Sequence, residues 1–263
     1  MKYILITGAC GGMGRKTAEL LARQGYGVIA LDQKPGAEGE NITFLQTDLT
    51  DERSIMKAFD KVSSVTESLF AIVHFAGIYM LDSLVEMKSE AFERIFRINL
   101  GGVFFVNKVF LPLLKKGSRI LITTSELAPL DPLPFTGIYA VTKGALDKYA
   151  YSLRMELQLL GIRVSVLRAG AVNTGMLGAS TAALEDFCSG TKLYTCNADR
   201  FRQIVDRVEA RHIPPERIAE KTKKILQKRN PGFAYAINRN PLLLLLNILP
   251  KGLQLWAIRL VLK

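Results

Sequence analysis

The sequence has few cysteines, which excludes one class of small extracellular protein. Three of its 263 residues are cysteines, an odd number and too few to crosslink a chain of this length. A disulfide-stapled scaffold is excluded, and the thiols fit a reducing compartment. No cleavable apolar leader follows Met1, because the strand-like run Tyr3–Ile6 begins at once and glycines come after it. We expect a cytoplasmic protein that starts at Met1.

Acidic residues are scarce at one end of the sequence. The chain carries 35 Lys+Arg and 24 Asp+Glu, a net charge of +11. Residues 200–263 hold 14 basic and 4 acidic residues, so +10 of this charge lies in the last quarter. Such a surface attracts phosphate, carboxylate or anionic lipid. We expect no nucleic-acid partner, because the sequence lacks an RNP-like aromatic motif, a zinc finger and a helix-turn-helix.

The sequence also lacks internal repeats and low-complexity linkers. Its composition, with 49% hydrophobic and 22% charged residues, is typical of a folded globular chain. Alternating β-rich and helical stretches predict an α/β fold, a single Rossmann-like domain over residues 1–263 with a doubly wound parallel sheet and helices on both faces. The predicted strands are Tyr3–Thr7, Gly27–Leu31, Thr43–Gln46, Ala71–Phe75, Arg119–Thr123, Arg163–Leu167 and Phe233–Ile237. The predicted helices are Gly14–Gln24, Asp51–Val62, Ser89–Leu114, Tyr139–Leu160 and one that starts at Pro214-Pro215-Glu216. Residues 169–198, rich in Gly, Ala, Ser and Thr without a clear period, are expected to form a mobile loop with room for a short helix.

A glycine-rich turn, Thr7–Gly14, follows the first predicted strand and opens the first helix. Glycines there permit a tight turn and let backbone N–H groups approach a pyrophosphate at the positive end of the helix. The second strand ends in Asp32, 24 residues after Gly8. A carboxylate at that point can accept hydrogen bonds from both adenosine ribose hydroxyls and repels a 2′-phosphate. We therefore expect NAD(H) as the preferred cofactor, while Lys34 and Arg15 offset the charge of Asp32 and leave NADP(H) open.

Tyr139 and Lys143 lie four residues apart, on one face of a predicted helix. A free tyrosine titrates near ~10, so it needs help to act as a base at neutral pH. A nearby ammonium lowers the pKa of the phenol by favouring the phenolate. The spacing predicts a phenol prepared for proton transfer.

These motifs, in this order, resemble the short-chain dehydrogenase/reductase family from Lys2 to about Thr174, and in particular its NAD(P)-dependent hydroxysteroid and retinol-type dehydrogenases. The resemblance implies an alcohol dehydrogenase or ketoreductase without a metal. It implies that four residues carry the catalysis: Asn99, Ser125, Tyr139 and Lys143. The cofactor contacts that it implies are Gly8, Gly11, Gly12, Met13, Gly14, Asp32, Asp48, Leu49, Ala76, Gly77, Asn99, Tyr139, Lys143, Gly170, Val172 and Thr174.

The resemblance also implies a mechanism. The phenolate of Tyr139 would remove the alcohol proton while hydride passes to the nicotinamide, and Lys143 would lower the pKa of the phenol and bond the nicotinamide ribose. Ser125 would hold the substrate oxygen, and Asn99 would position a water that links Lys143 to solvent. Residues 170–212 would form the substrate lid. Its apolar side chains suit a hydrophobic alcohol or ketone of steroid, retinoid or long-chain type: Met176, Leu177, Leu184 and Phe187.

A homodimer or homotetramer is the assembly that the resemblance implies. The helices Ser89–Leu114 and Tyr139–Leu160 would pack against partner copies. Four side chains make the first of these helices too apolar to be solvated all round: Phe104, Phe105, Val109 and Phe110.

The sequence departs from the family pattern at three places. The run from His74 to Gly77 replaces N-N-A-G, and we expect His74 to be a hydrogen-bonded strand-end histidine rather than a catalytic acid. Ser125 and Tyr139 are 14 residues apart, one more than is commonest in the family. We expect a one-residue loop extension there, with Glu126 as an exposed neighbour. Ala169 replaces the usual proline and loosens the start of the substrate loop.

The tail from Pro241 to Lys263 is nearly long enough to span a bilayer, but the break at Pro250-Lys251-Gly252 and the charge of Arg259 make spanning unfavourable. We expect two short apolar helices. Trp256 and the basic residues suit peripheral contact with the inner membrane surface. Packing over the pocket or at an oligomer interface is the equal alternative.

Two other functions stay open at this point. Gly8, Gly11 and Gly14 also match the G-x-x-G-x-x-G motif of sugar-nucleotide epimerases and dehydratases. Those enzymes usually add a substrate domain, and the roughly 90 residues after Thr174 leave little room for one. A non-catalytic NAD(H) sensor or membrane-docked scaffold is the second alternative. Such a protein would be free to lose Tyr139 and Lys143, which are both present.

Overall fold

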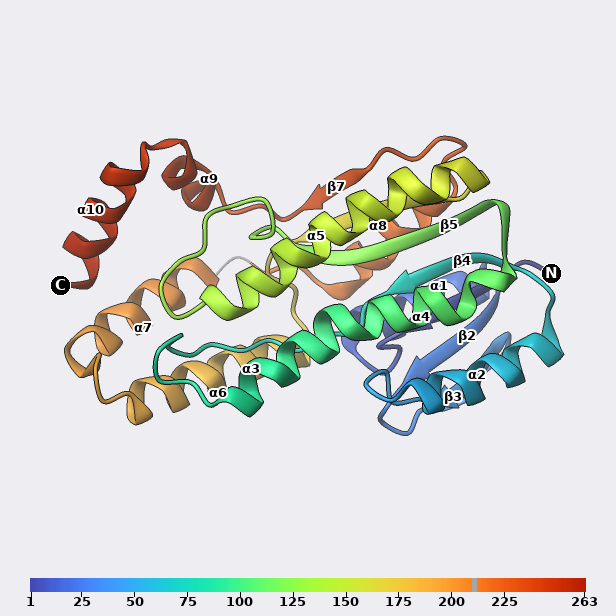
Figure 1. Cartoon of the computed structure of the whole chain (residues 1–263), viewed down its shortest axis with the longest axis horizontal. Coiled ribbons are helices and arrows are strands. Elements are labelled where there is room, and N and C mark those ends of the chain that lie inside the picture. The colour runs from blue at the N-terminus through green and yellow to red at the C-terminus, as the bar shows by residue number, and fades with distance from the viewer. Residues whose placement is uncertain (210–211) are drawn as a thin grey trace.

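The computed structural model describes residues 1–209 and 212–263, and a seven-stranded sheet runs through this part of the chain (Figure 1). The strand order is β3-β2-β1-β4-β5-β6-β7, and every neighbouring pair is parallel. The order reverses between β1 and β4, which is where doubly wound sheets bind ligands. The predicted Rossmann-like α/β fold is confirmed. The strands are β1 (Tyr3–Thr7), β2 (Gly27–Asp32), β3 (Ile42–Gln46), β4 (Leu69–His74), β5 (Leu114–Ser125), β6 (Arg163–Ala169) and β7 (Ala234–Ile237).

Helices cover both faces of the sheet because the strands are apolar on both faces. In β1, Ile4 and Ile6 join one core and Leu5 joins the other, and all three side chains are fully buried. The first core lies under α1 (Gly12–Arg23) and α8 (Pro215–Leu226). The second lies under α2 (Glu52–Val65), α4 (Gly102–Phe110) and α5 (Gly137–Leu157).

The predicted helix over Ser89–Leu114 is confirmed as a helical stretch over Ser89–Leu113, but its form changes along its length. It consists of α3 (Ser89–Phe96), a π-helical turn (Arg97–Gly101), α4 and a 3₁₀ turn (Leu111–Leu113) before β5 begins at Leu114. Pro112 lies in that 3₁₀ turn, and it lacks the N–H that an α-helix would use there. By length and composition this stretch could also cross a membrane, but Val103, Val106 and Phe110 pack it onto the sheet.

The prediction of a mobile loop over residues 169–198 is wrong, because most of this segment is helical. Helix α6 spans Gly175–Gly190, and α7 spans Thr195–Glu209. The side chain of Thr174 caps α6 by accepting a hydrogen bond from the Met176 N–H at 3.3 Å, and alanine-rich sequence favours helix once the end is capped. Residues 210–211 of the predicted lid lie outside the described residues.

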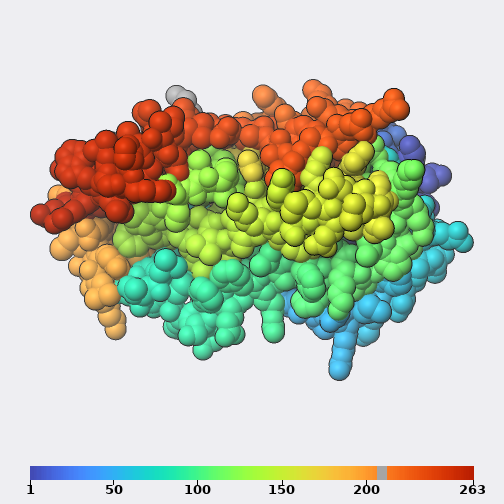
Figure 2. Space-filling view, turned by 45° about the horizontal axis from the view of Figure 1, so that its top comes forward, coloured from blue at the N-terminus to red at the C-terminus, as the bar shows by residue number. Residues whose placement is uncertain are grey.

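The C-terminal tail forms the two short helices that were predicted. Helix α9 spans Pro241–Ile248, α10 spans Lys251–Leu262, and Pro250 separates them. Figure 1 places both, together with α6 and α7, beyond the carboxyl ends of the strands. Figure 2 shows the same tail in red, covering one end of the molecule.

Candidate active site

Ser125, Tyr139 and Lys143 meet at the carboxyl end of the sheet. Ser125 is the last residue of β5, and the other two lie one turn apart on the face of α5 that packs against the sheet. All three side chains are buried, with 6%, 9% and 4% of their surfaces exposed. The structure therefore brings together three of the four predicted catalytic side chains in a site shielded from water.

The Tyr139 hydroxyl is hydrogen-bonded to Ser125, and its ring lies 4.9 Å from that of Tyr79, centroid to centroid. Burial raises the pKa of the phenol above its ordinary value of 10, Tyr79 adds to the rise, and the Ser125 hydrogen bond opposes it. The phenol is thus protonated at neutral pH. In this state Tyr139 is prepared to donate a proton to a carbonyl oxygen.

The Lys143 ammonium lies 5.7 Å from the centroid of the Tyr139 ring and donates a hydrogen bond to the Thr123 carbonyl at 3.4 Å. Burial lowers the pKa of Lys143 from 10.5 to about 8. The side chain also borders Gly77, where a Cβ would come within 3.3 Å of the Lys143 nitrogen. Gly77 thus leaves room for the lysine beside the chain that follows β4.

Asn99 lies in the π-helical turn and is fully buried. Its amide accepts a hydrogen bond from the Ile78 N–H at 2.8 Å, and donates to the Ile78 carbonyl at 3.0 Å and the Thr142 hydroxyl at 3.2 Å. The side chain thus ties the segment after β4 to α5, one residue before Lys143. The predicted water between Asn99 and Lys143 stays a prediction. Periodicity in the sequence did not indicate the π turn, although such turns occur often at functional sites.

The glycine-rich turn joins β1 to α1 and lies against two other predicted cofactor segments. Gly8 has φ +68°, and a Cβ there would lie 2.6 Å from the Ala76 backbone nitrogen. A Cβ on Gly12 would lie 2.7 Å from the Thr174 methyl. The turn is therefore packed between the segments after β4 and β6, as a site that crosses the switch point requires.

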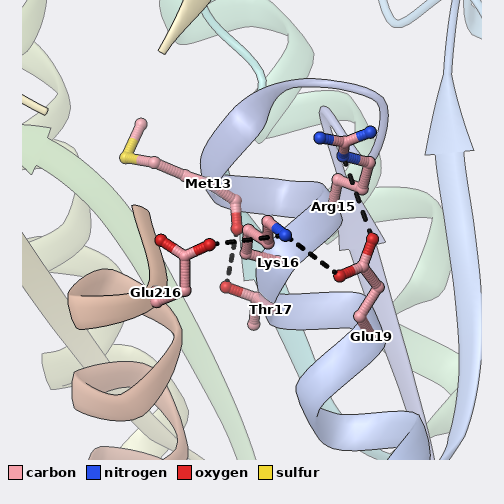
Figure 3. Close-up of polar contacts among 6 residues, drawn as sticks. All are labelled: Met13, Arg15, Lys16, Thr17, Glu19 and Glu216. Atoms are coloured by element: carbon pink, nitrogen blue, oxygen red, sulfur yellow. Dashed lines mark hydrogen bonds and ion pairs between the residues drawn. The ribbon is translucent and has the colours of Figure 1, made fainter. Parts of the chain in front are cut away.

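The first turn of α1 has the features of an anion site. Its N-cap residue, Gly11, offers no side chain to the backbone N–H groups, and the first turn holds no acid. Figure 3 shows Met13 and Arg15 on different sides of this helix. Arg15 lies 3.9 Å from Glu19, and Lys16 lies 3.3 Å from Glu216 of α8 (Figure 3). Glu19 and Glu216 thus pair with Arg15 and Lys16, the basic side chains nearest the turn.

Asp32 ends β2 beside the same turn. Its carboxylate accepts hydrogen bonds from the Cys10 N–H at 2.9 Å and the Lys34 N–H at 3.0 Å. Each carboxylate oxygen has a second lone pair, so Asp32 keeps capacity for ribose hydroxyls. Cys10 is no activated thiol, since burial and the Asp32 charge raise its pKa.

The other predicted cofactor residues lie around the same edge. Asp48 is exposed and accepts two hydrogen bonds from Thr50, each 2.8 Å long, while Leu49 packs against Gly102. Their predicted adenine contact stays a prediction. After β6, a Cβ on Gly170 would overlap the Asn238 carbonyl, and Val172 is buried.

His74 is the hydrogen-bonded strand-end histidine that the sequence predicted. It is 1% exposed, its Nε2 lies 2.9 Å from Asn107 Oδ1, and its Nδ1 lies 3.5 Å from the Thr7 hydroxyl. Burial lowers its pKa from 6.5 to about 4. A neutral imidazole in this packing supports the sheet.

A cavity of about 560 Å³ opens beside Ser125, Tyr139 and Lys143. This size suits a drug-sized or lipid-like molecule. Of the four predicted lid residues, Met176 and Leu177 line the cavity, whereas Leu184 and Phe187 pack in a separate aromatic cluster around Phe135. Further apolar lining comes from Phe75, Leu127, Leu133, Phe201, Ile204, Val205, Leu242 and Leu243.

The prediction that Glu126 is exposed is wrong. Glu126 is partly buried and lines the cavity, where its carboxylate accepts a hydrogen bond of 2.5 Å from the Asn240 N–H. Burial raises the pKa of Glu126, and the Asn240 bond and Arg239 oppose the rise. Residues 238–243 complete this wall of the cavity. Packing of the tail over the pocket, one of the alternatives for Pro241–Lys263, is thus confirmed for its first residues, whereas the sequence gave no sign of the role of residues 238–240.

Comparison with known proteins identifies the class. The short chain dehydrogenase family model matches residues 2–185. A 3-ketodihydrosphingosine reductase of Bacteroides thetaiotaomicron is 26% identical over 233 residues, which are 88% of this chain and 86% of the relative. Estradiol 17-beta-dehydrogenase 2 of Mus musculus is 33% identical over 192 residues, which are 68% of this chain and 50% of the relative. The chain thus matches about half the length of that second relative.

Solved structures share the fold. A short chain dehydrogenase family protein from Francisella tularensis has a TM-score of 0.76 and 24% identity, covering 90% of this chain and 97% of its own. A 3-ketoacyl-(acyl-carrier-protein) reductase from Brucella melitensis, complexed with NADH, has a TM-score of 0.73 and 22% identity, covering 90% and 96%. The chain belongs to the short-chain dehydrogenase family. It is an oxidoreductase of the alcohol dehydrogenase and ketoreductase type.

Proposed function

We propose that this protein uses NAD(H) to interconvert an apolar secondary alcohol and its ketone. The observation that carries the proposal is the buried group of Ser125, Tyr139 and Lys143 at the edge of a mostly apolar cavity. Members of this family bind nicotinamide dinucleotides, and the residues around the switch point fit such a group.

The fit rests on the glycine-rich turn and its neighbours. The uncapped first turn of α1 would hold the pyrophosphate, Asp32 the adenosine ribose, and Lys143 the nicotinamide ribose. When bound, the nicotinamide supplies or accepts the hydride at the carbon of the substrate. The chain's own residues bind and orient the cofactor and the substrate, exclude water and move the proton.

In the reduction of a ketone, Ser125 would donate a hydrogen bond to the carbonyl oxygen and Tyr139 would transfer its proton to that oxygen. The carbonyl carbon gains the hydride and the oxygen gains the proton, so the product is a neutral alcohol. Lys143, with a pKa of about 8, is mainly an ammonium at neutral pH and stabilises the phenolate that Tyr139 leaves behind. The raised pKa of Tyr139 keeps the phenol protonated at neutral pH, so the proton that reduction needs is in place.

The substrate class follows from the cavity wall. The side chains of Leu133, Phe201 and Leu243 surround the space beyond Tyr139, and few charged groups enter it. The names of the two relatives, a ketodihydrosphingosine reductase and an estradiol dehydrogenase, both refer to apolar molecules. We infer a steroid-like, retinoid-like or long-chain ketone.

The decisive test replaces the phenol. Tyr139→Phe should abolish NADH-dependent reduction of a panel of ketones while leaving NADH affinity nearly unchanged, because only the reacting oxygen is lost. Lys143→Ala should damage both turnover and affinity. Tyr151→Phe is the matched control, since Tyr151 is an exposed tyrosine of the same helix. Appreciable turnover by Tyr139→Phe would remove this residue from the mechanism.

Cofactor choice is tested separately. Asp32→Ala should narrow or invert the preference for NADH, measured as paired kcat/KM values with NADH and NADPH. The reasoning fails if the unmodified protein already prefers NADPH.

We also propose a homodimer or homotetramer. Of the four apolar residues that suggested an interface, Val109 and Phe110 are core residues, and Phe104 is 45% exposed on α4. On α5, Val141 is 45% and Met155 is 48% exposed. A single-subunit mass by light scattering at micromolar concentration would contradict this assembly.

We propose a cytoplasmic location, in a reducing compartment. The free thiols of Cys10, Cys188 and Cys196 support it. Fractionation of cells should recover the protein from the cytoplasm and from the inner face of the membrane. Recovery from an oxidising compartment would contradict the proposal.

A further inference from the structure

The two C-terminal helices expose the apolar residues that soluble helices usually bury. In α10 the buried residue is Gln254, with 5% of its surface exposed, whereas Leu255, Trp256 and Leu260 are 69%, 60% and 62% exposed. In α9 only Leu243 is buried. The other exposed apolar residues of α9 and α10, which together with Leu255, Trp256 and Leu260 are called the exposed face below, are Leu242, Leu245, Ile248, Leu253 and Val261.

Polar contacts hold this segment on the protein. The Asn240 N–H donates to Glu126, and Asn247 Oδ1 accepts a hydrogen bond of 2.7 Å from the Asp131 N–H. Lys251 forms an ion pair with the Asp131 carboxylate. These bonds fix α9 and the start of α10, and Leu243 and Leu262 pack inward, while the exposed apolar side chains stay on the surface.

Charge selects among the partners that could cover such a face. The last 43 residues hold nine Lys+Arg and no Asp or Glu. Arg259 and Lys263 are exposed on or beside α10, and Trp256 has the amphipathic ring that prefers a lipid interface. Leucine, tryptophan and basic residues without acids are the composition of a segment that rests on anionic lipid.

The exposed face continues into the cavity. Pro241, Leu242 and Leu243 line the same cavity as Tyr139 and Lys143. The same helix, α9, therefore forms part of the cavity wall and part of the exposed face.

We propose that α9 and α10 dock on an anionic lipid surface and hold the mouth of the cavity against it. The helices lie in the plane of the headgroups, with Leu255, Trp256 and Leu260 inserted and Arg259 and Lys263 against lipid phosphate. Direct entry of a substrate from the lipid is a consequence that rests on the proposed function. Docking itself needs no substrate.

The experiment uses the full chain, without substrate, and reads the fluorescence of Trp256, the one tryptophan of the sequence. Vesicles of phosphatidylcholine with 30% phosphatidylglycerol are compared with pure phosphatidylcholine by fluorescence titration and by sedimentation. We expect a blue shift and co-sedimentation with the anionic vesicles, both weakened at 0.5 M salt. Arg259→Gln and Lys263→Gln should each weaken partitioning about fivefold.

Matched variants separate docking through α10 from nonspecific hydrophobic adsorption to vesicles. Leu255→Ser with Leu260→Ser should abolish vesicle binding, whereas Leu159→Ser with Leu160→Ser, at 83% and 57% exposed positions after α5, should not. Thermal unfolding checks that each variant is folded. The proposal is overturned if the unmodified protein stays in the supernatant at low salt, or if both pairs bind vesicles like the unmodified protein. It is also overturned if the Leu255/Leu260 pair changes the oligomeric mass and not vesicle binding, since a second copy then covers the face. NADH turnover of a water-soluble ketone, measured without vesicles, tests the proposed function independently.

Discussion

Lowering the pH should destabilise the protein through His74. The imidazole is enclosed by Thr7 and Asn107, and burial lowers its pKa from 6.5 to about 4. Between these two values the unfolded chain binds a proton at His74 and the folded chain does not. The free energy of unfolding therefore falls as the pH falls, from pH 6.5 down to pH 4.

The size of the effect follows from the two pKa values of His74. Proton linkage removes about 1.8 kcal/mol of stability between pH 7 and pH 5, and about 2.8 kcal/mol between pH 7 and pH 4. For a chain of this length, the loss at pH 5 corresponds to a fall of about 3 °C in melting temperature. Below pH 4 the folded protein is protonated as well, and the loss from this group levels off.

The assay compares urea unfolding at pH 7 and pH 5, at one protein concentration, for the unmodified protein and His74→Asn. An asparagine keeps hydrogen-bonding capacity toward Thr7 and Asn107 but does not titrate, so the variant should lose about 1.8 kcal/mol less on acidification. His212, the second of two histidines, is exposed, and His212→Asn is the matched control. Equal losses for the unmodified protein and His74→Asn would refute the reasoning.

Three further predictions concern the site and its support. Asp147→Asn should destabilise the protein by about 3 kcal/mol in urea unfolding, because Arg168, held at 2.6 Å, would keep its charge without its partner; a loss under 1 kcal/mol would contradict this. The kcat/KM for ketone reduction should stay flat from pH 6 to pH 7.5, since the raised pKa keeps Tyr139 protonated, whereas alcohol oxidation should rise with pH. A steady fall of the reduction rate over that range would contradict it. Gly170→Ala should prevent soluble expression or lower the melting temperature by more than 5 °C, because the added methyl would overlap the Asn238 carbonyl; an unchanged melting temperature would show that the two segments can separate freely.

The fold was predictable because its signals are local. Each predicted strand is a short apolar run, and the structure extends or shifts these strands at their ends without adding one to the sheet. The helix break at Pro250 was predictable for the same reason, since proline acts on its own neighbours. The motif residues Ser125, Tyr139 and Lys143 could be named from their order along the chain.

What could not be predicted depends on contacts between distant segments. Helix α6 has no clear apolar period, and Phe187 is fixed by Phe135, 52 residues away in the sequence. Glu126 is partly buried because Asn240, 114 residues later, donates to it. The π turn holds Asn99, whose amide is hydrogen-bonded to Ile78, 21 residues earlier, and to Thr142, 43 residues later. No window of neighbouring residues holds this information.

The cavity wall that the Glu126–Asn240 hydrogen bond joins is made late in synthesis, because Asn240 follows Glu126 by 114 residues. The predicted catalytic side chains have all been made once Lys143 is added, but the wall around Leu243 follows 100 residues later. At about 5–20 residues per second, the growing chain spends roughly 5–20 s with its predicted catalytic residues made and its cavity wall incomplete. During that time the wall formed by residues 238–243 is missing, so we expect no enclosed cavity beside Tyr139. A chain shortened before Asn240 would keep the predicted catalytic residues Ser125, Tyr139 and Lys143 and lose the part of the cavity wall around Leu243.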